Sequence, residues 1–476
     1  MSRLAPPRPA RSAAGPRRVL LAGSAGNFTE WYEFGVYGAF ATVIADRFFT
    51  PAQAAGQGGA GPLVAAYASF AVSFFFRPVG AVLFGRIGDR AGRRPALVLV
   101  IVLMTLATTL IGLLPDRDAI GAAAPWLLTL LRVLQGLCLG GEFGGAVALM
   151  TESAPPGRRG RHGAWQSFTV ALGLLAGAAV AALLAGLLGP AALHAWGWRI
   201  PFLLALPLGL AAYRLRTGLP EDPPPAPAPT RPPDPAPAPE PAPPEAVPAA
   251  AGAGPAGRAA GGTAVSGTGP GPARTTPAGA GTARAVGLGV ARLMGWSAAG
   301  YTFLVVLPSY LQATLGASFR QALTATALAN LGFAAAILPA GILSDRVGRR
   351  PVMLAGALGV TLLALPLLHL LQDPAAAAPA KAAAVLGAGA TVGLLAGPGP
   401  AMLAEMFPAR VRCTGLGLAY ALTGAVFSGC AGLVITALTA ATGDHDVPAY
   451  YAAGTCAISA LALAGLRGDD HRRPLE

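Results

Sequence analysis

Long apolar stretches alternate with short polar segments along most of the chain. Each stretch is close to or above the roughly 20 residues that an α-helix needs to cross the hydrocarbon core of a bilayer. A helix satisfies its own backbone amide and carbonyl groups, which is necessary where no water is present. The pattern predicts an all-α membrane protein with twelve transmembrane helices. The predicted helices are residues 19–47, 63–84, 96–114, 126–150, 163–188, 198–215, 287–311, 322–343, 352–371, 382–405, 413–438 and 448–467.

One long segment breaks this alternation and separates six helices from six. Its central part, residues 220–277, holds 19 of the 45 prolines, mixed with Ala, Gly and a few charges. Such a composition buries too little apolar surface to fold, so we expect a disordered cytoplasmic linker. The predicted organisation is a basic tail (1–18), a first bundle (19–216), the linker (217–286), a second bundle (287–467) and a short tail (468–476).

Composition agrees with a membrane protein and argues against other classes. Hydrophobic residues make up 54% of the chain and charged residues only 12%, against roughly 25% charged residues in soluble domains. The net charge of +13 does not indicate nucleic-acid binding, because no folded polar domain carries it. The four cysteines lie in or beside apolar runs without the spacing of a metal site, so neither disulfides nor a bound metal is expected.

Arginine clusters follow helices 2, 4, 8 and 10, whereas residues 48–62 carry no positive charge. Short cytoplasmic loops are enriched in Lys and Arg. We therefore expect a multi-pass protein of the cell membrane with both termini in the cytoplasm.

The two halves repeat the same short sequences. GRIGDRAGRRP (85–95) and GILSDRVGRRP (341–351) each follow the second helix of a half, and MTESAPPGRRGR (150–161) is echoed by LAEMFPARVR (403–412) after the fourth. Two parallel copies of a six-helix unit explain both repeats. In transporters built from such repeats, the substrate binds at the midplane between them.

These phrases resemble the major facilitator superfamily, whose two pseudo-symmetric six-helix bundles carry G-x-x-x-D-R-x-G-R-R between helices 2 and 3. Within it, the chain is similar to the metabolite:proton symporter family, which includes transporters of proline and betaine, 2-oxoglutarate, shikimate and citrate. The resemblance rests on GNFTEWYEFGVYG (26–38), FRPVGAVLFGRIGDRAGRRP (76–95), LRVLQGLCLGGEFGGA (131–146), GWRIPFLLALPLGL (197–210), LPSYL (307–311) and EMFPARVRCTGLGLAY (405–420). It implies the major facilitator fold and proton-coupled uptake.

Two features depart from the family pattern. Glu33 stands where the family commonly has Asp, which keeps the carboxylate but lengthens its reach. Residues 424–436, GAVFSGCAGLVIT, lack the G-G-x-x-P run expected in helix 11.

Ionisable residues within membrane spans are candidates for function, because their burial in a bilayer is costly. In helix 1, Asn27, Glu30, Glu33 and Tyr37 share one face at 100° per residue. A carboxylate on this face can exchange a proton. The alternative is a structural hydrogen-bond network that ties helix 1 to its neighbours.

Helix 4 carries a second polar face formed by Arg132, Gln135 and Glu142. Its R-x-x-Q-G resembles the superfamily motif associated with proton coupling. Arg132 is expected to hold a carboxylate substrate or to tune Glu30 or Glu33, the alternative being a permanent strut. We predict proton coupling by Glu30, Glu33, Arg132 and Glu142, and substrate binding by Asn27, Tyr37, Arg77, Arg132 and Gln135.

The repeated loop motif implies, by resemblance, a latch that closes the cytoplasmic side. Its aspartates would accept hydrogen bonds at a helix N-terminus and pair with arginine. The predicted gate consists of Gly85, Asp89, Arg90, Gly92, Arg93 and Arg94 in the first half and Asp345, Arg349 and Arg350 in the second.

Alternating access of a midplane cavity, with symport of a proton and a small carboxylate or zwitterionic metabolite, is the function that the resemblance implies. We expect no cofactor beyond the proton gradient, and a functional monomer in the lipid bilayer. A drug:proton antiporter of the same fold is the nearest alternative, although residues 163–190 lack that group's G-x-x-x-G-P-x-x-G-G pattern. A sensor of the same fold would normally need an added cytoplasmic signalling domain, and the only large insertion in this chain is the predicted disordered linker. An enzyme is not indicated either, because no catalytic set of residues lies on adjacent helices at useful spacing.

Overall fold

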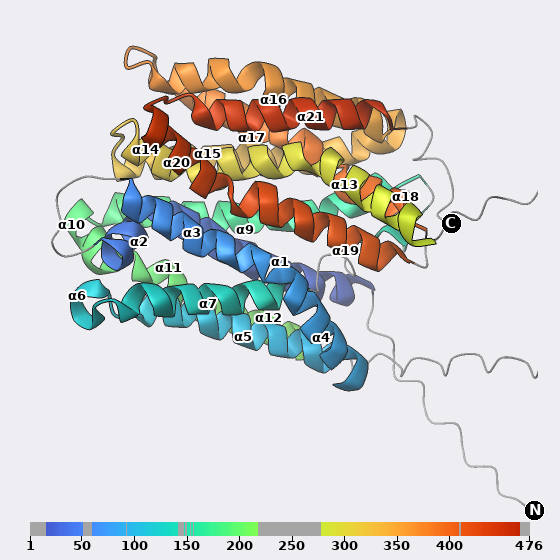
Figure 1. Cartoon of the computed structure of the whole chain (residues 1–476), viewed down its shortest axis with the longest axis horizontal. Helices are drawn as coiled ribbons and strands as arrows, with labels where there is room; N and C mark the ends of the chain where they lie inside the picture. The colour runs from blue at the N-terminus through green and yellow to red at the C-terminus, as the bar shows by residue number, and fades with distance from the viewer. Residues whose placement is uncertain are drawn as a thin grey trace, which may run out of the picture.

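The computed structural model describes residues 16–50, 60–91, 93–140, 147, 150–152, 154–155, 157–217, 278–408 and 411–466. Within these ranges the regular structure is entirely helical, without a strand. Figure 1 shows the helices running side by side in two groups, the first half (blue to green) below the second (yellow to red). The predicted all-α architecture of two helical bundles is confirmed.

The spans of the first bundle follow the predicted order. They are α1 (Pro16–Ala39) with α2 (Ala41–Ile44) and η1 (Ala45–Phe49); α3 (Gly61–Phe75) with α4 (Arg77–Ala91); α5 (Arg93–Leu113); α7 (Ala123–Leu139); α9 (Arg159–Leu187); and α11 (Arg199–Leu203) with α12 (Ala205–Thr217). The connecting segments contain α6 (Arg117–Ile120), α10 (Pro190–Ala192) and η3 (Leu193–Gly197).

The second bundle repeats this order. Its spans are α13 (Ala278–Tyr301) with η4 (Thr302–Val306) and α14 (Leu307–Ala313); α15 (Phe319–Val347); α16 (Arg349–Gln372); α17 (Ala378–Ala396) with α18 (Gly399–Met406); α19 (Arg412–Thr423) with η6 (Gly424–Gly429) and α20 (Ala431–Thr442); and α21 (Val447–Ala464). Among the described residues, ten helices are long and apolar enough to cross a membrane. The remaining two spans are α7, which has 17 described residues, and α1, which contains Glu30 and Glu33.

Most helix boundaries differ from the sequence prediction by a few residues, and two helices begin inside segments that were predicted to be tail or linker. α1 begins at Pro16, inside the predicted tail, and α13 begins at Ala278, inside the predicted linker. The sequence after Pro277 is rich in Ala and free of proline, so a helix can start well before the apolar run. The rest of the predicted linker and tails, residues 1–15, 218–277 and 467–476, lies outside the described residues.

Prolines interrupt helices that the apolar pattern suggested to be continuous. Pro78 follows the break between α3 and α4 at Phe76, and Pro308 follows the π-helical segment η4. A proline inside a helix donates no backbone hydrogen bond and displaces the carbonyl four residues earlier. The Leu304 carbonyl, four residues before Pro308, accepts a hydrogen bond from Asn330 Nδ2 at 3.2 Å. Apolarity alone contains no signal for these breaks.

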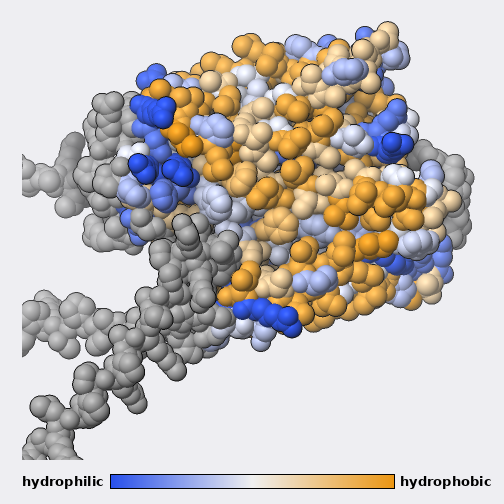
Figure 2. All heavy atoms as spheres, turned by 180° about the vertical axis from the view of Figure 1, so that it is seen from behind, coloured by the Kyte–Doolittle hydropathy of each residue, from blue (hydrophilic) through white to orange (hydrophobic). Residues whose placement is uncertain are grey.

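The outer surface of the bundles is apolar where lipid would cover it. Figure 2 shows one face that is mainly hydrophobic between hydrophilic ends. Trp126, Leu187, Leu362 and Leu461 are at least 70% exposed. Large exposed apolar side chains on so many helices are consistent with a bilayer environment.

Glycines allow neighbouring helices of a bundle to approach closely. A Cβ atom on Gly136 of α7 would collide with the Ser73 carbonyl of α3, and one on Gly140 with the Arg77 carbonyl of α4. In the second bundle, Gly389 of α17 meets the Ala329 carbonyl of α15 in the same way. Small residues at these crossings are the usual basis of tight helix packing in membranes.

We expect Gly136→Val to destabilise the protein by about 3 kcal/mol or more, because the added side chain has only rigid backbone to displace. Unfolding in detergent, followed by heat or denaturant, measures the effect. Gly186→Val is the matched control, since no atom lies within 4 Å of a Cβ at Gly186. Equal stability of the two variants would contradict the close packing of α3 and α7.

Candidate functional site

A small cavity lies between the two bundles, lined by residues from both. Six aromatic side chains contribute to its wall: Trp31, Phe74, Trp296, Tyr301, Phe333 and Tyr420. Its volume is about 40 Å³, and a water needs about 10–15 Å³ of such space. The cavity therefore has room for a few waters but not for a metabolite.

Arg77 is the charged residue of this cavity. Its side chain is 4% exposed, and its guanidinium carbon lies 4.0 Å from the centre of the Phe74 ring. Within the described part of the chain, Arg77 Nε and Nη2 and the nearby Tyr301 hydroxyl make no hydrogen bond. A buried guanidinium with unused donors is unfavourable unless something else binds it. Arg77 therefore has hydrogen-bond donors that are not used within the described part of the chain.

A second polar cluster lies inside the first bundle and is centred on Glu33, which is 1% exposed. Gln135 Nε2 donates to Glu33 Oε2 at 3.3 Å and to Thr108 Oγ1 at 2.7 Å. Arg132 Nη1 donates to Gln135 Oε1 at 2.9 Å. Gln135 therefore connects the carboxylate to the guanidinium, an arrangement that can change when Glu33 gains or loses a proton.

Aromatic rings fill the space between Arg77 and Arg132. The Arg77 guanidinium carbon lies 5.4 Å from the centre of the Phe34 ring. The Arg132 guanidinium carbon lies 3.4 Å from the Tyr37 ring centre and 5.1 Å from that of Phe70. The Phe34 and Phe70 rings meet edge-on with centres 5.5 Å apart. This packed layer separates the cavity from the carboxylate and can transmit a displacement from one to the other.

The predicted substrate-binding residues do not all reach the cavity. Asn27 Nδ2 donates to the Gln166 carbonyl at 3.1 Å and to Thr169 Oγ1, so it ties α1 to α9. Tyr37 donates to the Ala66 carbonyl at 2.9 Å, and Gln135 belongs to the Glu33 cluster. Of the predicted set, Arg77 alone lines the cavity.

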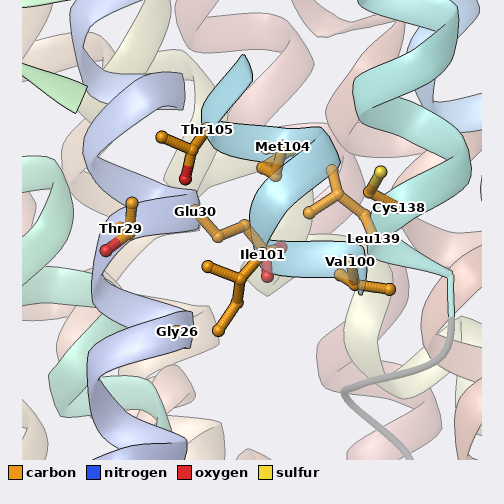
Figure 3. A pocket seen from close by; sticks show the side chains of 9 residues that line it. All are labelled: Gly26, Thr29, Glu30, Val100, Ile101, Met104, Thr105, Cys138 and Leu139. Atoms are coloured by element: carbon orange, nitrogen blue, oxygen red, sulfur yellow. The ribbon is translucent and has the colours of Figure 1, made fainter. Parts of the chain in front are cut away.

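Glu30 lines a second pocket, which lies within the first bundle. Figure 3 shows its side chain directed from α1 toward α5, among side chains of α5 and α7. The hydroxyl of Thr105 faces the same pocket. Glu142, the remaining residue predicted for proton coupling, lies outside the described residues.

The aromatic lining and the two threonines were not predicted as site residues. Trp31 and Trp296 occur within apolar runs, where a ring that packs in a core or faces lipid gives the same signal. Thr105 and Thr108 lie one turn apart on α5, but threonines of membrane helices commonly bond to their own backbone. The sequence did contain one signal for the aromatic layer. Phe34 and Tyr37, and likewise Phe70 and Phe74, are spaced so that each pair lies on one face of its helix.

The second copy of the loop motif joins the two bundles at one end of their interface. The Asp345 carboxylate accepts hydrogen bonds from the backbone N–H groups of Gly160 (2.7 Å) and Arg161 (2.9 Å), at the start of α9. Arg349 Nη1 donates to Asp345 Oδ1 at 2.8 Å, and Arg349 Nη2 donates to Glu405 Oε1 at 3.0 Å. A carboxylate at a helix N-terminus also interacts favourably with the helix dipole.

The other residues predicted for the gate are either exposed or lie outside the described residues. Arg350 and Arg90 are exposed. In the first half, α4 ends at Ala91 and α5 begins at Arg93. Gly92 and the side chains of Asp89, Arg93 and Arg94, as well as the surroundings of Gly85, lie outside the described residues. A further contact between the halves joins Arg412 Nη1 and Glu152 Oε1 at 2.6 Å.

The two bundles are also joined at the opposite end of the interface. Tyr67 and Ser309 share a hydrogen bond of 2.6 Å between their hydroxyl oxygens, and Thr42 Oγ1 donates to Gln312 Oε1 at 3.0 Å. Each bond joins a helix of the first bundle to a helix of the second. The cavity thus has contacts between the halves on both sides, as an intermediate of alternating access requires.

Asp345→Asn is expected to loosen the closed gate, because it weakens both the α9 contact and the Arg349 pair. A loss of about 2 kcal/mol would raise the population of the open gate about thirtyfold. Spin labels at the exposed positions Arg161 and Arg346 report this opening as a longer distance. Asp373→Asn, on an exposed loop at the opposite end, is the control. An unchanged distance distribution would contradict the latch.

Two helical bundles around a central cavity, with contacts between them on both sides of it, define the architecture of an alternating-access transporter. The first half of the chain, residues 19–224, matches the model "Sugar (and other) transporter", and residues 285–476 match "Major Facilitator Superfamily". The crystal structure of a D-xylose-proton symporter superimposes with a TM-score of 0.70, at 18% identity, over 97% of this chain and 100% of the other.

Two curated relatives align along nearly the whole chain. The ectoine/proline transporter ProP of Corynebacterium glutamicum is 32% identical over 443 residues, which cover 92% of this chain and 81% of the relative. The citrate-proton symporter of Salmonella typhi is 31% identical over 464 residues, 96% of either chain. The chain belongs to the major facilitator superfamily, in its metabolite:proton symporter family, and is a multi-pass membrane transporter.

Proposed function

We propose that the protein takes up a small zwitterion bearing one carboxylate, together with a proton, by alternating access. Arg77, buried with unused donors in an aromatic cavity between the bundles, is the observation on which this rests. We further propose that it acts as a monomer in the cell membrane with both termini in the cytoplasm. It needs no cofactor beyond the proton gradient and catalyses no covalent reaction.

The cavity chemistry favours one carboxylate and one diffuse positive charge. The guanidinium of Arg77 can bind a carboxylate through two parallel N–H groups. The rings of Trp31, Trp296 and Tyr420 offer faces that attract a secondary or quaternary ammonium group. Since no acidic side chain of the described chain lines the cavity, aromatic faces would take the role of the counter-charge.

The same chemistry disfavours a tricarboxylate. A single guanidinium would neutralise one of three carboxylates, and the aromatic wall would desolvate the other two without compensation. Among the relatives, the cavity therefore fits the cargo of the ectoine/proline transporter better than that of the citrate-proton symporter.

Proton coupling is proposed to reside in the Glu33 cluster. Protonation of Glu33 removes the charge that Gln135 and Arg132 face, so the two residues rearrange. The aromatic layer carries this change to Phe34 and Arg77, and so to the substrate. Coupling of this kind is a linkage between proton and substrate affinity.

Counterflow in proteoliposomes tests the substrate class without requiring a proton gradient. Liposomes loaded with unlabelled glycine betaine, proline, 2-oxoglutarate, shikimate or citrate are diluted into the same solute with a label. We expect rapid exchange of glycine betaine or proline and none of citrate. Exchange of citrate alone, or of tetramethylammonium, which has no carboxylate, would contradict the role of Arg77. Export of hydrophobic cations would indicate the antiporter alternative.

A further inference from the structure

The pocket around Glu30 belongs to the first bundle only. Its lining comes from α1, α5 and α7, with Glu30, Met104, Thr105 and Cys138 among its residues. Its volume is about 20 Å³, enough for one water. The central cavity, by contrast, takes its lining from both bundles and includes neither Glu30 nor Glu33.

Thr105 supplies independent support for a bound water. Its side chain is 8% exposed, and its hydroxyl has no hydrogen-bond partner in the described structure. The neighbouring hydroxyls of Thr108 and Thr109 donate to the carbonyls of Met104 and Thr105, four residues earlier on their own helix. The Thr105 hydroxyl instead faces the pocket that contains Glu30 (Figure 3). The lining is otherwise mainly apolar, so a water in this space would bind to the Thr105 hydroxyl and the Glu30 carboxylate.

The pocket continues the polar chain that begins at Glu33. Glu33 and Glu30 lie one turn apart on α1, and Thr108 and Thr105 lie one turn apart on α5. Gln135 Nε2 already bonds both Glu33 and Thr108. The next turn of each helix, toward the end where α1 begins, therefore presents Thr105 and Glu30. This is the end that the Asp345 latch closes.

Charged groups flank the chain at both ends. Arg132 lies at the Glu33 end, bonded to Gln135. Arg216 packs against Gly26 at the other end, where a Cβ on Gly26 would collide with its guanidinium. A carboxylate between two guanidinium groups can lose a proton without leaving an uncompensated charge.

We propose that the coupled proton leaves Glu33 through this pocket, by way of a water held by Thr105 and then Glu30, on a path separate from the substrate cavity. The inference rests on the proton-coupled function proposed above. Protonated Glu33 gives its proton to the water, and the water passes one of its protons to the Glu30 carboxylate. Glu30 then releases the proton to the cytoplasm, so Glu33 ends as a carboxylate and the water is restored.

Thr105→Val tests the relay, because valine keeps the shape and removes the hydroxyl. In proteoliposomes with an inside-alkaline gradient, we expect the initial rate of uptake to fall at least about tenfold, while counterflow, which requires no proton release, keeps its wild-type rate. Thr105→Ser should restore uptake. Thr109→Val is the matched control, since its hydroxyl is bonded within its own helix.

Several results would overturn the relay. One is wild-type uptake by Thr105→Val, and another is an equal loss of uptake and counterflow that Thr105→Ser does not restore. Retained gradient-driven uptake by Glu30→Gln would exclude Glu30 as the next acceptor. A wild-type protein that exchanges substrate but never responds to the gradient would overturn the proposed symport itself, and the relay with it.

Discussion

Replacing Arg77 with glutamine is expected to abolish saturable uptake while leaving the protein at least as stable as the wild type. The buried guanidinium has unused donors at Nε and Nη2, so its removal relieves an unfavourable burial that the empty protein bears. A substrate carboxylate would lose two charge-assisted hydrogen bonds, about 3 kcal/mol or more. The affinity should fall about a hundredfold.

Arg77→Lys separates charge from geometry. A lysine keeps the positive charge but cannot present two parallel donors, so we expect an affinity between those of the wild type and Arg77→Gln. Counterflow kinetics give the affinities, and thermal unfolding in detergent gives the stabilities. If Arg77→Gln lowers stability in proportion to its loss of uptake, Arg77 is a structural residue and not the substrate anchor.

Glu33→Gln is expected to separate exchange from accumulation. Glutamine preserves the size of the side chain and a hydrogen bond with Gln135, but it cannot release a proton. One coupled proton supports about tenfold accumulation per pH unit, so the variant should reach an inside-to-outside ratio of about one. Counterflow should continue, because exchange needs the occluded complex and no net proton movement.

Glu33→Asp is the companion variant. It keeps the carboxylate but withdraws it from Gln135, whose Nε2 already lies 3.3 Å from Glu33 Oε2. We expect accumulation to survive at a reduced rate. Accumulation by Glu33→Gln equal to that of the wild type would place the proton site elsewhere in the protein.

Charge within apolar runs was sufficient to find the residues that form the Glu33 cluster. Glu33, Gln135 and Arg132 share one cluster because two helical faces predicted from residue spacing point at each other. Arg77 stood out for the same reason. Burial of these groups in a bilayer is costly, and that cost makes them visible in the sequence.

The neighbours of these residues could not be predicted in the same way. Residue spacing placed Asn27 on the face of Glu33, yet it bonds to α9 while Glu33 bonds to α7. The position of a residue on a helix does not say which helix packs against it. The aromatic wall was missed because Trp and Tyr in an apolar span resemble core residues. The role proposed for Thr105 depends on the hydrogen bonding of its hydroxyl, which the sequence does not show.

The division into two bundles followed from the repeated motifs and the long proline-rich segment. The helix breaks at Phe76 and at η4 did not follow from the apolar pattern, since a membrane helix tolerates proline when a neighbour satisfies the freed carbonyl. Asn330 does this for Leu304. Both breaks adjoin cavity residues, Phe74 and Arg77 at the first and Tyr301 and Leu304 at the second, so local irregularity coincides with the site.

The direction of net flux under opposing gradients tests proton-coupled symport most directly. Proteoliposomes with a tenfold outward gradient of glycine betaine or proline are given increasing inside-alkaline pH gradients, with the membrane potential clamped at zero. Symport of one proton predicts that net efflux turns to influx as the gradient passes about one pH unit. Efflux that persists at every pH gradient would contradict coupling, and influx driven only by an inside-acidic gradient would establish antiport instead.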